Sequence, residues 1–326
     1  MDLSTLGTET RNERTTDLDR MPVTELLAVM NAEDRSVALA VREALPEIAA
    51  AVEAVTRSLR LGGRLIYLGA GTSGRIGLLD AVECPPTFGT SPEQVVGLLS
   101  GGPGAFAVAV EGAEDEPARA VADLDGVGVD ERDTVVGLAA SGRTPYVVGG
   151  LKHAAARGAV TVSVACNADA VVSRYADFPI EVPTGPEVVT GSTRLKAGTA
   201  EKMVCNMLST ASMVRLGKVY GNLMVDVRAS NDKLVDRARR MVVQATGAGP
   251  EAAAEALRAA QGHAKTAIVM LLAHCTAEEA ARRLSEARGD TRTAVAAGRA
   301  DRAVRPRRGQ DATKRAISPS TTVSAR

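Results

Sequence analysis

The chain has 326 residues, with 39 basic and 39 acidic side chains and 2% aromatic residues. This length suffices for a large α/β core and a small additional domain, while the balanced charge and scarce aromatic residues argue against a nucleic-acid surface. No run reaches the roughly 18 apolar residues of a membrane span, the N-terminus is polar and unlike a signal peptide, and four widely spaced cysteines favour neither a zinc site nor disulfides. We therefore expect a cytoplasmic protein that binds neither nucleic acid nor membrane.

The first 60 residues predict a helical segment that packs on the core. Residues 1–20 are polar and would form a loop unless something covers them. Apolar residues at helical spacing then predict a helix over 23–30 and a longer one over 37–59, where Pro46 implies a kink or an early turn.

Five short apolar runs follow and predict strands. They are separated by helix-like or loop segments of crossover length, which is typical of a doubly wound parallel sheet flanked by helices. One such helix is expected over 104–122. The runs cover 65–68, 94–99, 134–139, 160–164 and 178–182.

The C-terminal third is predicted to be helical. A long helix is expected over 195–216 and another within 217–245, which would complete a sheet domain spanning 61–245. Residues 246–298 are rich in Ala and Glu and predict a small helical domain. Residues 299–326 carry eight basic and two acidic residues and predict a disordered basic tail.

The glycine-rich turn at 69–74 matches GxGxxG, but the chain does not support a dinucleotide site. The second strand ends in Leu99-Ser100-Gly101 without the acid that would hold a ribose, and no Lys-Ser or Lys-Thr follows the glycines as in a P-loop. What remains is a set of hydroxyl-bearing turns at strand ends, which suit a phosphorylated small molecule. The alternative is that these residues only cap helices. The turns contain Gly71, Thr72, Ser73, Ser141, Thr144, Ser192 and Thr193.

Three acids are candidates for proton transfer. Glu83 precedes Pro85-Pro86, which we expect to stop the helix and to hold this carboxylate near the same sheet edge. Glu111 and Glu114 are expected to share one helix face. If one of them faces Glu83 across a sugar phosphate, an acid and a base would support elimination or isomerisation without a metal. The alternative is that all three are solvated carboxylates, and spacing alone does not decide.

Several motifs together resemble the N-acetylmuramic acid 6-phosphate etherases of the sugar isomerase (SIS) domain superfamily. The resemblance extends from about Leu6 to Ala287, and the basic residues after Arg299 fall outside it. The motifs are TETRN (8–12), GAGTSGR (69–75), ECPPTFG (83–89), VEGAEDE (110–116), ASGRTPY (140–146), VVTGSTRLKAGTAEK (188–202) and GNLMVDV (221–227).

The resemblance implies cleavage of the lactyl ether of N-acetylmuramic acid 6-phosphate, giving N-acetylglucosamine 6-phosphate and D-lactate in cell-wall recycling. It implies no cofactor and a homodimer with sites near the subunit interface. It makes Glu83 the proton donor to lactate and Glu114 the second catalytic acid, and it adds Arg143 and Lys196 to the substrate ligands. The alternative from another class is a phosphosugar-binding regulator on the same fold, and an isomerase or a dinucleotide enzyme is disfavoured.

Overall fold

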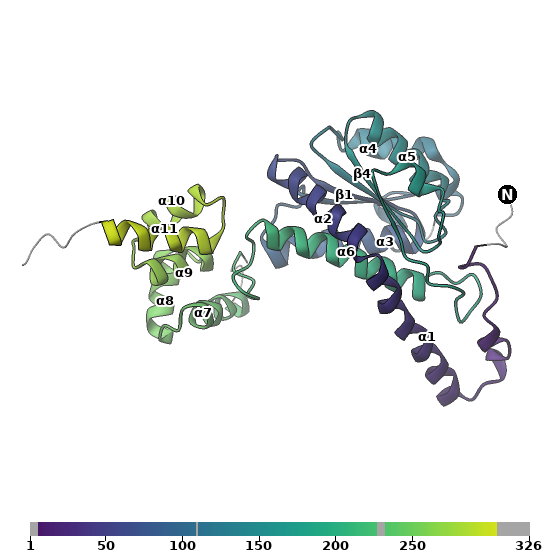
Figure 1. Ribbon diagram of the computed structural model, residues 1–326, viewed down its shortest axis with the longest axis horizontal. Coiled ribbons are helices and arrows are strands. Elements are labelled where there is room, and N and C mark those ends of the chain that lie inside the picture. The colour runs from purple at the N-terminus through teal and green to yellow at the C-terminus, as the bar shows by residue number, and fades with distance from the viewer. Residues whose placement is uncertain (1–5, 109, 227–231, 305–326) are drawn as a thin grey trace, which may run out of the picture.

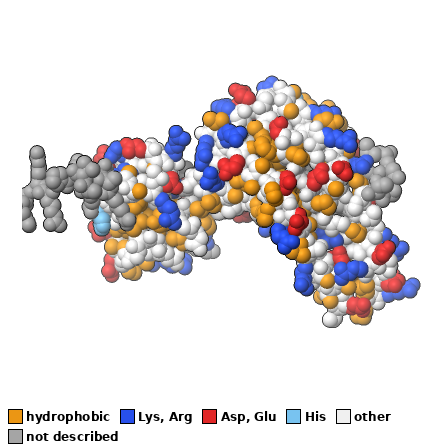
Figure 2. Space-filling model, viewed as in Figure 1, with side chains coloured by type: hydrophobic (Ala, Val, Ile, Leu, Met, Phe, Trp, Pro, Cys, Tyr) orange, Lys and Arg blue, Asp and Glu red, His pale blue; other side chains and the backbone are white. Residues whose placement is uncertain are grey.

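A computed structural model describes residues 6–108, 110–226 and 232–304 of the chain. Figure 1 shows an α/β body and, beside it, a small bundle of helices toward the C-terminus. Acidic and basic side chains are interspersed on the face seen in Figure 2.

The α/β body contains a five-stranded parallel sheet in the order β2-β1-β3-β4-β5, which confirms the predicted doubly wound architecture. The order reverses between β1 and β3, so the turns that follow these strands diverge and leave a crevice at the carboxyl edge of the sheet. The strands are β1 (Leu65–Gly69), β2 (Val95–Leu99), β3 (Thr134–Leu138), β4 (Val160–Ala165) and β5 (Phe178–Glu181).

Helices cover both faces of the sheet because successive side chains of each strand point to opposite sides. In β1, Leu65 and Tyr67 pack in one core cluster with the helices on one face, whereas Ile66 and Leu68 pack in a second cluster with those on the other. The first face carries α2 (Leu45–Arg60), α3 (Gly71–Phe88) and α6 (Lys196–Arg215), and the second carries α4 (Pro117–Gly126) and α5 (Pro145–Ala156) (Figure 1).

The N-terminal segment packs on this body. α1 (Val23–Glu43) contacts α6, and it ends just before Ala44, so the break from α2 comes later than the sequence suggests. Pro46 lies in the first turn of α2, where its missing N–H costs nothing. Residues 6–20 contain two short 3-10 turns, and Thr8 and Asn12 are buried, so the polar N-terminus is covered by the body.

Two local predictions were wrong. The helix expected over 104–122 is replaced by 3-10 turns at Pro103–Phe106 and Ala113–Asp115, and α4 begins only at Pro117. Gly112, which lies inside the predicted range, has a positive φ angle, which interrupts a helix. Pro85 and Pro86 do not stop α3 either: it continues to Phe88 and ends at Gly89, whose φ of 62° is left-handed.

The C-terminal helices form clusters of their own. α7 (Asp232–Thr246) contacts α8 and α9, and its Ala238, Met241 and Val242 belong to the apolar cluster of those helices. We therefore propose a domain boundary between α6 and α7, earlier than residue 246. The other helices are α8 (Pro250–Ala259), α9 (Ala264–Ala273), α10 (Ala277–Glu286) and α11 (Thr291–Val304). α11 extends to Val304, so residues 299–304 are helical. The rest of the predicted tail, 305–326, lies outside the described residues.

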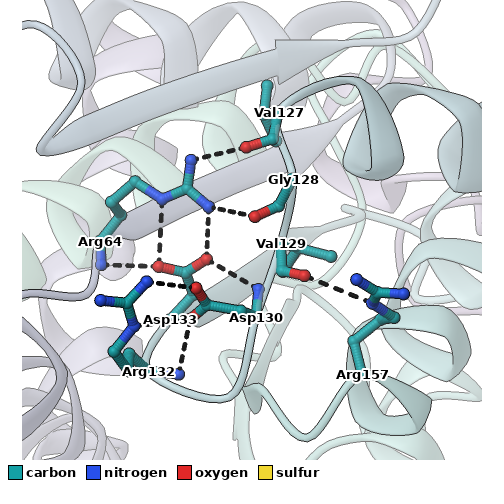
Figure 3. Close-up of polar contacts among 8 residues, drawn as sticks. All are labelled: Arg64, Val127, Gly128, Val129, Asp130, Arg132, Asp133 and Arg157. Carbon is teal, nitrogen blue, oxygen red and sulfur yellow. Dashed lines mark hydrogen bonds and ion pairs between the residues drawn. The ribbon is translucent and has the colours of Figure 1, made fainter.

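A polar network fixes the amino edge of the sheet, opposite the crevice (Figure 3). The Asp133 carboxylate, just before β3, accepts hydrogen bonds from the Arg64 guanidinium at 2.6 Å and 3.1 Å and from the Arg64 amide at 2.8 Å. Arg64 also donates to the carbonyls of Val127 and Gly128. The network joins the start of β1 to the start of β3.

Candidate functional site

The turn after β1 leaves the N-terminus of α3 open. The Gly74 amide donates to the Ala70 carbonyl at 3.1 Å, and no side chain caps the preceding donors. A methyl group on Gly74 would overlap the Gly69 carbonyl oxygen, so the tight turn requires glycine there. The first-turn N–H groups and the positive end of the helix dipole are thus available to an anion.

A pocket of about 190 Å³ opens beside this turn. Gly71, Glu111 and Glu114 all line it, and both acids are exposed. The loop that carries the acids is held to the end of β2, because the Ser100 hydroxyl donates to the Ala113 carbonyl at 2.6 Å. Glu111 lies in a loop and Glu114 in a 3-10 turn, so the two do not share a helix face as expected. Glu114 is nevertheless beside the predicted phosphate turn.

The other predicted turns lie along the same edge of the sheet. Ser141 and Arg143 follow β3, the neighbour of β1, and the Arg143 amide donates to the Ser141 hydroxyl at 3.3 Å. Thr144 precedes α5 and makes no side-chain cap.

Thr72 and Thr193 approach each other across Gly198 of α6. A methyl group on Gly198 would lie 3.4 Å from Cγ2 of Thr72 and 3.5 Å from the Thr193 carbonyl oxygen. Ser192 is partly buried next to Thr193. The N-terminus of α6 therefore closes one side of the turn after β1.

The α6 N-terminus is itself already occupied. The Glu187 carboxylate accepts hydrogen bonds from the backbone amides of Lys196 at 2.9 Å and Ala197 at 3.0 Å. This buried carboxylate satisfies the helix donors that an anion would otherwise use. Sequence reasoning missed Glu187 because it lies nine residues before the amide that it caps.

Lys196 was predicted to contact the substrate, and the structure places it in an ion pair. Its side chain is 3% exposed, and its ammonium lies 2.7 Å from the Glu33 carboxylate of α1. Arg14 donates to the other Glu33 oxygen at 2.7 Å. Burial raises the pKa of Glu33, but the hydrogen bond and charge of Lys196, together with Arg14, outweigh it, and the net pKa is lowered.

Glu83 does not lie where the sequence led us to expect. It is exposed on α3, twelve residues beyond Gly71, which corresponds to about 18 Å along the helix axis. The helix runs away from the carboxyl edge of the sheet, so within one chain Glu83 is remote from the turn. The expectation that it sits at that edge was wrong because the helical residues between Gly71 and Glu83 carry it along α3 away from the edge.

Buried polar groups behind the site were also missed. Asp80 accepts hydrogen bonds from Tyr67 at 2.9 Å, Asn206 at 2.8 Å and Ser209 at 3.1 Å. Burial raises the pKa of Asp80, and these bonds lower it by less. Glu201 of α6 is wholly buried behind Ser73. The sequence did offer a signal for Glu201, because this acid stands among the small and apolar residues of one face of α6.

In the part of the chain that the structure describes, no three His, Cys, Asp or Glu residues are grouped so that they could hold a metal ion. No described helix has both the length and the apolar character needed to cross a membrane.

Known proteins match this chain over nearly its whole length. It is 77% identical over 298 residues to the N-acetylmuramic acid 6-phosphate etherase of Mycolicibacterium smegmatis, which covers 91% of this chain and 100% of the relative. The chain belongs to the N-acetylmuramic acid 6-phosphate etherase family. An etherase from an Exiguobacterium species is 59% identical over 293 residues, or 90% of this chain and 100% of the relative.

Models of two domain families match parts of this etherase-family chain. The SIS domain model matches residues 123–211. The model of the glucokinase regulatory protein N-terminal SIS domain matches residues 47–155. Both matches fall largely within the α/β body and agree with the SIS-type fold.

Proposed function

We propose that the crevice at the carboxyl edge of the sheet cleaves the lactyl ether of N-acetylmuramic acid 6-phosphate. The observation that carries this proposal is the uncapped N-terminus of α3 opening into a pocket that Glu114 also lines. The helix end provides N–H donors for the phosphate, and the carboxylate provides a proton-transfer group within the same pocket. The hydroxyls and guanidinium that would hold the phosphosugar belong to Thr72, Ser73, Ser141, Arg143, Thr144, Ser192 and Thr193.

The reaction requires one base and one acid. In the opened sugar the C2 proton is acidified by the C1 aldehyde, and its removal allows the C3–O bond to break. The departing lactate oxygen takes a proton. Water then adds its hydroxyl to C3 and a proton to C2, so that one water is consumed and N-acetylglucosamine 6-phosphate and D-lactate are formed. We assign one proton-transfer role to Glu114 and the donation to lactate to Glu83.

Glu83 would serve the pocket of a second copy of the chain. It is separated from the turn of its own chain by most of α3, yet it lies beside Leu79 and Val82, which are 47% and 60% exposed. α6 packs against α3 and has an open cavity of about 440 Å³ next to Met203 and Met207. A twofold pairing over this apolar surface would set the α3 helices side by side in opposite directions. Each Glu83 would then approach the partner's pocket.

D-lactate release from N-acetylmuramic acid 6-phosphate tests the function directly. We expect Glu83→Gln and Glu114→Gln to reduce turnover by at least about 100-fold, as loss of general acid-base catalysis does. Glu116→Gln is the matched control, because this exposed acid lies two residues beyond Glu114 outside the pocket. A folded protein that binds the phosphosugar but releases no lactate would instead be a binding regulator.

Coexpression of the two inactive variants tests the shared site separately. In mixed dimers one site would keep both acids, so random assembly would restore about a quarter of the wild-type activity. If both acids act within one chain, mixing restores nothing. Analytical ultracentrifugation of the wild type reports whether the homodimer forms at all.

A cytoplasmic location is the remaining proposal. Cys84, Cys166 and Cys205 are buried thiols that form no disulfide. Free thiols are stable in a reducing compartment. Cell fractionation would test this, and recovery of the protein outside the cytoplasm would contradict it.

A further inference from the structure

Glu201 is a buried acid for which the reaction described above has no role. Its side chain is 0% exposed, and neither carboxylate oxygen makes a hydrogen bond of normal geometry to a described residue. A buried carboxyl without partners is costly to keep. Its position next to the predicted phosphate turn suggests a use for it.

The face of α6 that bears Glu201 is the one that meets the start of α3. Gly198 and Cys205 lie three residues before and four residues after Glu201, so all three share one side of the helix. On this side Gly198 lies against Thr72. Ser73 follows Thr72 in the first turn of α3 and is buried as Glu201 is. The Ser73 hydroxyl lowers the pKa of Glu201.

Among the described residues, no cation balances the charge that Glu201 would carry. The titratable groups that face it are the Cys166 thiol after β4 and the Cys205 thiol on α6. Burial is the largest cause that raises the pKa of each thiol, and the charge of Glu201 raises it further. Two other carboxylates border this region, because Glu187 also raises the pKa of Cys166 and Asp80 that of Cys205. The neighbouring lysines interact with other acids: Lys196 forms an ion pair with Glu33, and the charge of Lys202 lowers the pKa of Asp80. Burial therefore raises the pKa of Glu201 to about 8, with Ser73 lowering it by less.

We propose that Glu201 is a positioning residue that, as a neutral carboxylic acid, donates its proton to the Ser73 oxygen and so leaves the Ser73 hydroxyl free to donate to the substrate phosphate. Ionisation would reverse this arrangement. The carboxylate would accept the Ser73 proton, turn the hydroxyl away from the phosphate and add a negative charge behind a dianion. The inference rests on the proposed function only in placing the phosphate at the α3 N-terminus.

The pH dependence of binding distinguishes this role from simple packing. Above about pH 8 the Kd of N-acetylglucosamine 6-phosphate should rise by about tenfold per pH unit for the wild type, since only the protonated enzyme binds well. The second ionisation of a phosphate monoester is complete well below this pH. Calorimetry in buffers of different ionisation enthalpy at pH 9 should therefore show uptake of about one proton per ligand bound.

Glu201→Gln is the decisive variant, because its amide can donate to Ser73 and does not ionise. We expect its Kd at pH 7 to be within about threefold of the wild type, its Kd to stay level above pH 8, and proton uptake to vanish. Ser73→Ala should weaken binding about tenfold, as expected for a lost charge-assisted hydrogen bond.

Three results would overturn the proposal. The first is a wild-type Kd that stays level from pH 7 to 9.5, and the second is a Kd that rises with pH in Glu201→Gln as it does in the wild type. The third is a loss of turnover by orders of magnitude in Glu201→Gln at an unchanged Kd, which would make Glu201 a base. The calorimetry on the wild type decides the question even if the variant does not fold. Because product binding is measured, a failure of lactate release leaves the test intact.

Discussion

The ammonium of Lys196 lies 2.7 Å from the Glu33 carboxylate and joins residues 163 positions apart in the chain. This pair holds the start of α6 against α1. Because Gly198 of α6 lies against Thr72, the pair also supports the turn after β1. Arg14 binds the same carboxylate and adds the N-terminal segment to the assembly. The N-terminal segment thereby supports the site from outside the sheet domain.

Glu33→Gln should destabilise the protein. Removing one partner of a buried ion pair leaves the other charge uncompensated, which costs about 3 kcal/mol in the free energy of unfolding. Glu43→Gln is the control, because its pair with Arg42 is exposed, and exposed pairs contribute little. Urea unfolding measures both. Equal stability of Glu33→Gln and the wild type would mean that Lys196 is free to serve another partner, such as the substrate.

The pair of Glu33 and Lys196 also predicts how the stability of the protein depends on pH. The pKa of Glu33 is lowered in the folded state, so its stabilising contribution is complete above the ordinary glutamate value of about 4.3 and is lost as pH falls through the folded pKa. The difference in unfolding free energy between the wild type and Glu33→Gln should therefore shrink below about pH 4. A difference that grows on acidification would contradict this assignment.

Asp133→Asn should lower stability without changing substrate binding. Asp133 is buried and receives three hydrogen bonds from Arg64 (Figure 3), so loss of its charge should cost about 3 kcal/mol. The network lies at the edge of the sheet opposite the crevice, and KM should stay within about twofold. Asp130→Asn, which alters the more exposed pair with Arg132, is the matched control. A large change in KM would show coupling between the two edges.

Gly74→Ala should damage both folding and the phosphate turn. The added methyl would overlap the Gly69 carbonyl oxygen and approach Leu99 Cδ1 to 2.6 Å, and such overpacking costs about 1–3 kcal/mol. Because the displaced turn holds Thr72 and Ser73, phosphosugar affinity should fall as well. Gly126→Ala is the control, since that site has open space. Thermal unfolding and calorimetric titration of the phosphosugar would measure the two effects.

The sequence could predict the sheet because each strand is a short apolar run with clear ends. The turn GAGTSGR could be placed at the carboxyl edge of the sheet for the same reason, because it directly follows β1. Spacing did not place Glu114 beside this turn, and only the resemblance gave Glu114 a role there. Local signals failed where tertiary packing decided. Pro85 and Pro86 were accommodated within α3, and Gly112 with its positive φ broke the expected helix after β2.

Partners distant in the chain could not be found from spacing. Glu187 caps a helix across a loop, and Lys196 meets Glu33 only because α1 packs on α6. The burial of Glu201 depends on the arrangement of α3, β4 and α6 around it. A single sequence does not encode such arrangements in a local pattern, whereas the folded chain shows them directly.

Glu201→Gln should stabilise the protein increasingly as pH rises. Between the ordinary glutamate pKa of about 4.3 and the folded value of about 8, the folded chain holds a proton that the unfolded chain has lost. Stability of the wild type should therefore fall relative to Glu201→Gln by up to about 1.4 kcal/mol per pH unit across this window, and the difference should level off above pH 8. Glu181→Gln is the control for a partly buried acid, because Glu181 already accepts hydrogen bonds from Asp169, Ala170 and Ser173. Urea unfolding of all three proteins at pH 5, 6.5 and 8 gives the slopes, and a wild-type slope equal to that of Glu201→Gln would mean that Glu201 is ionised in the folded protein.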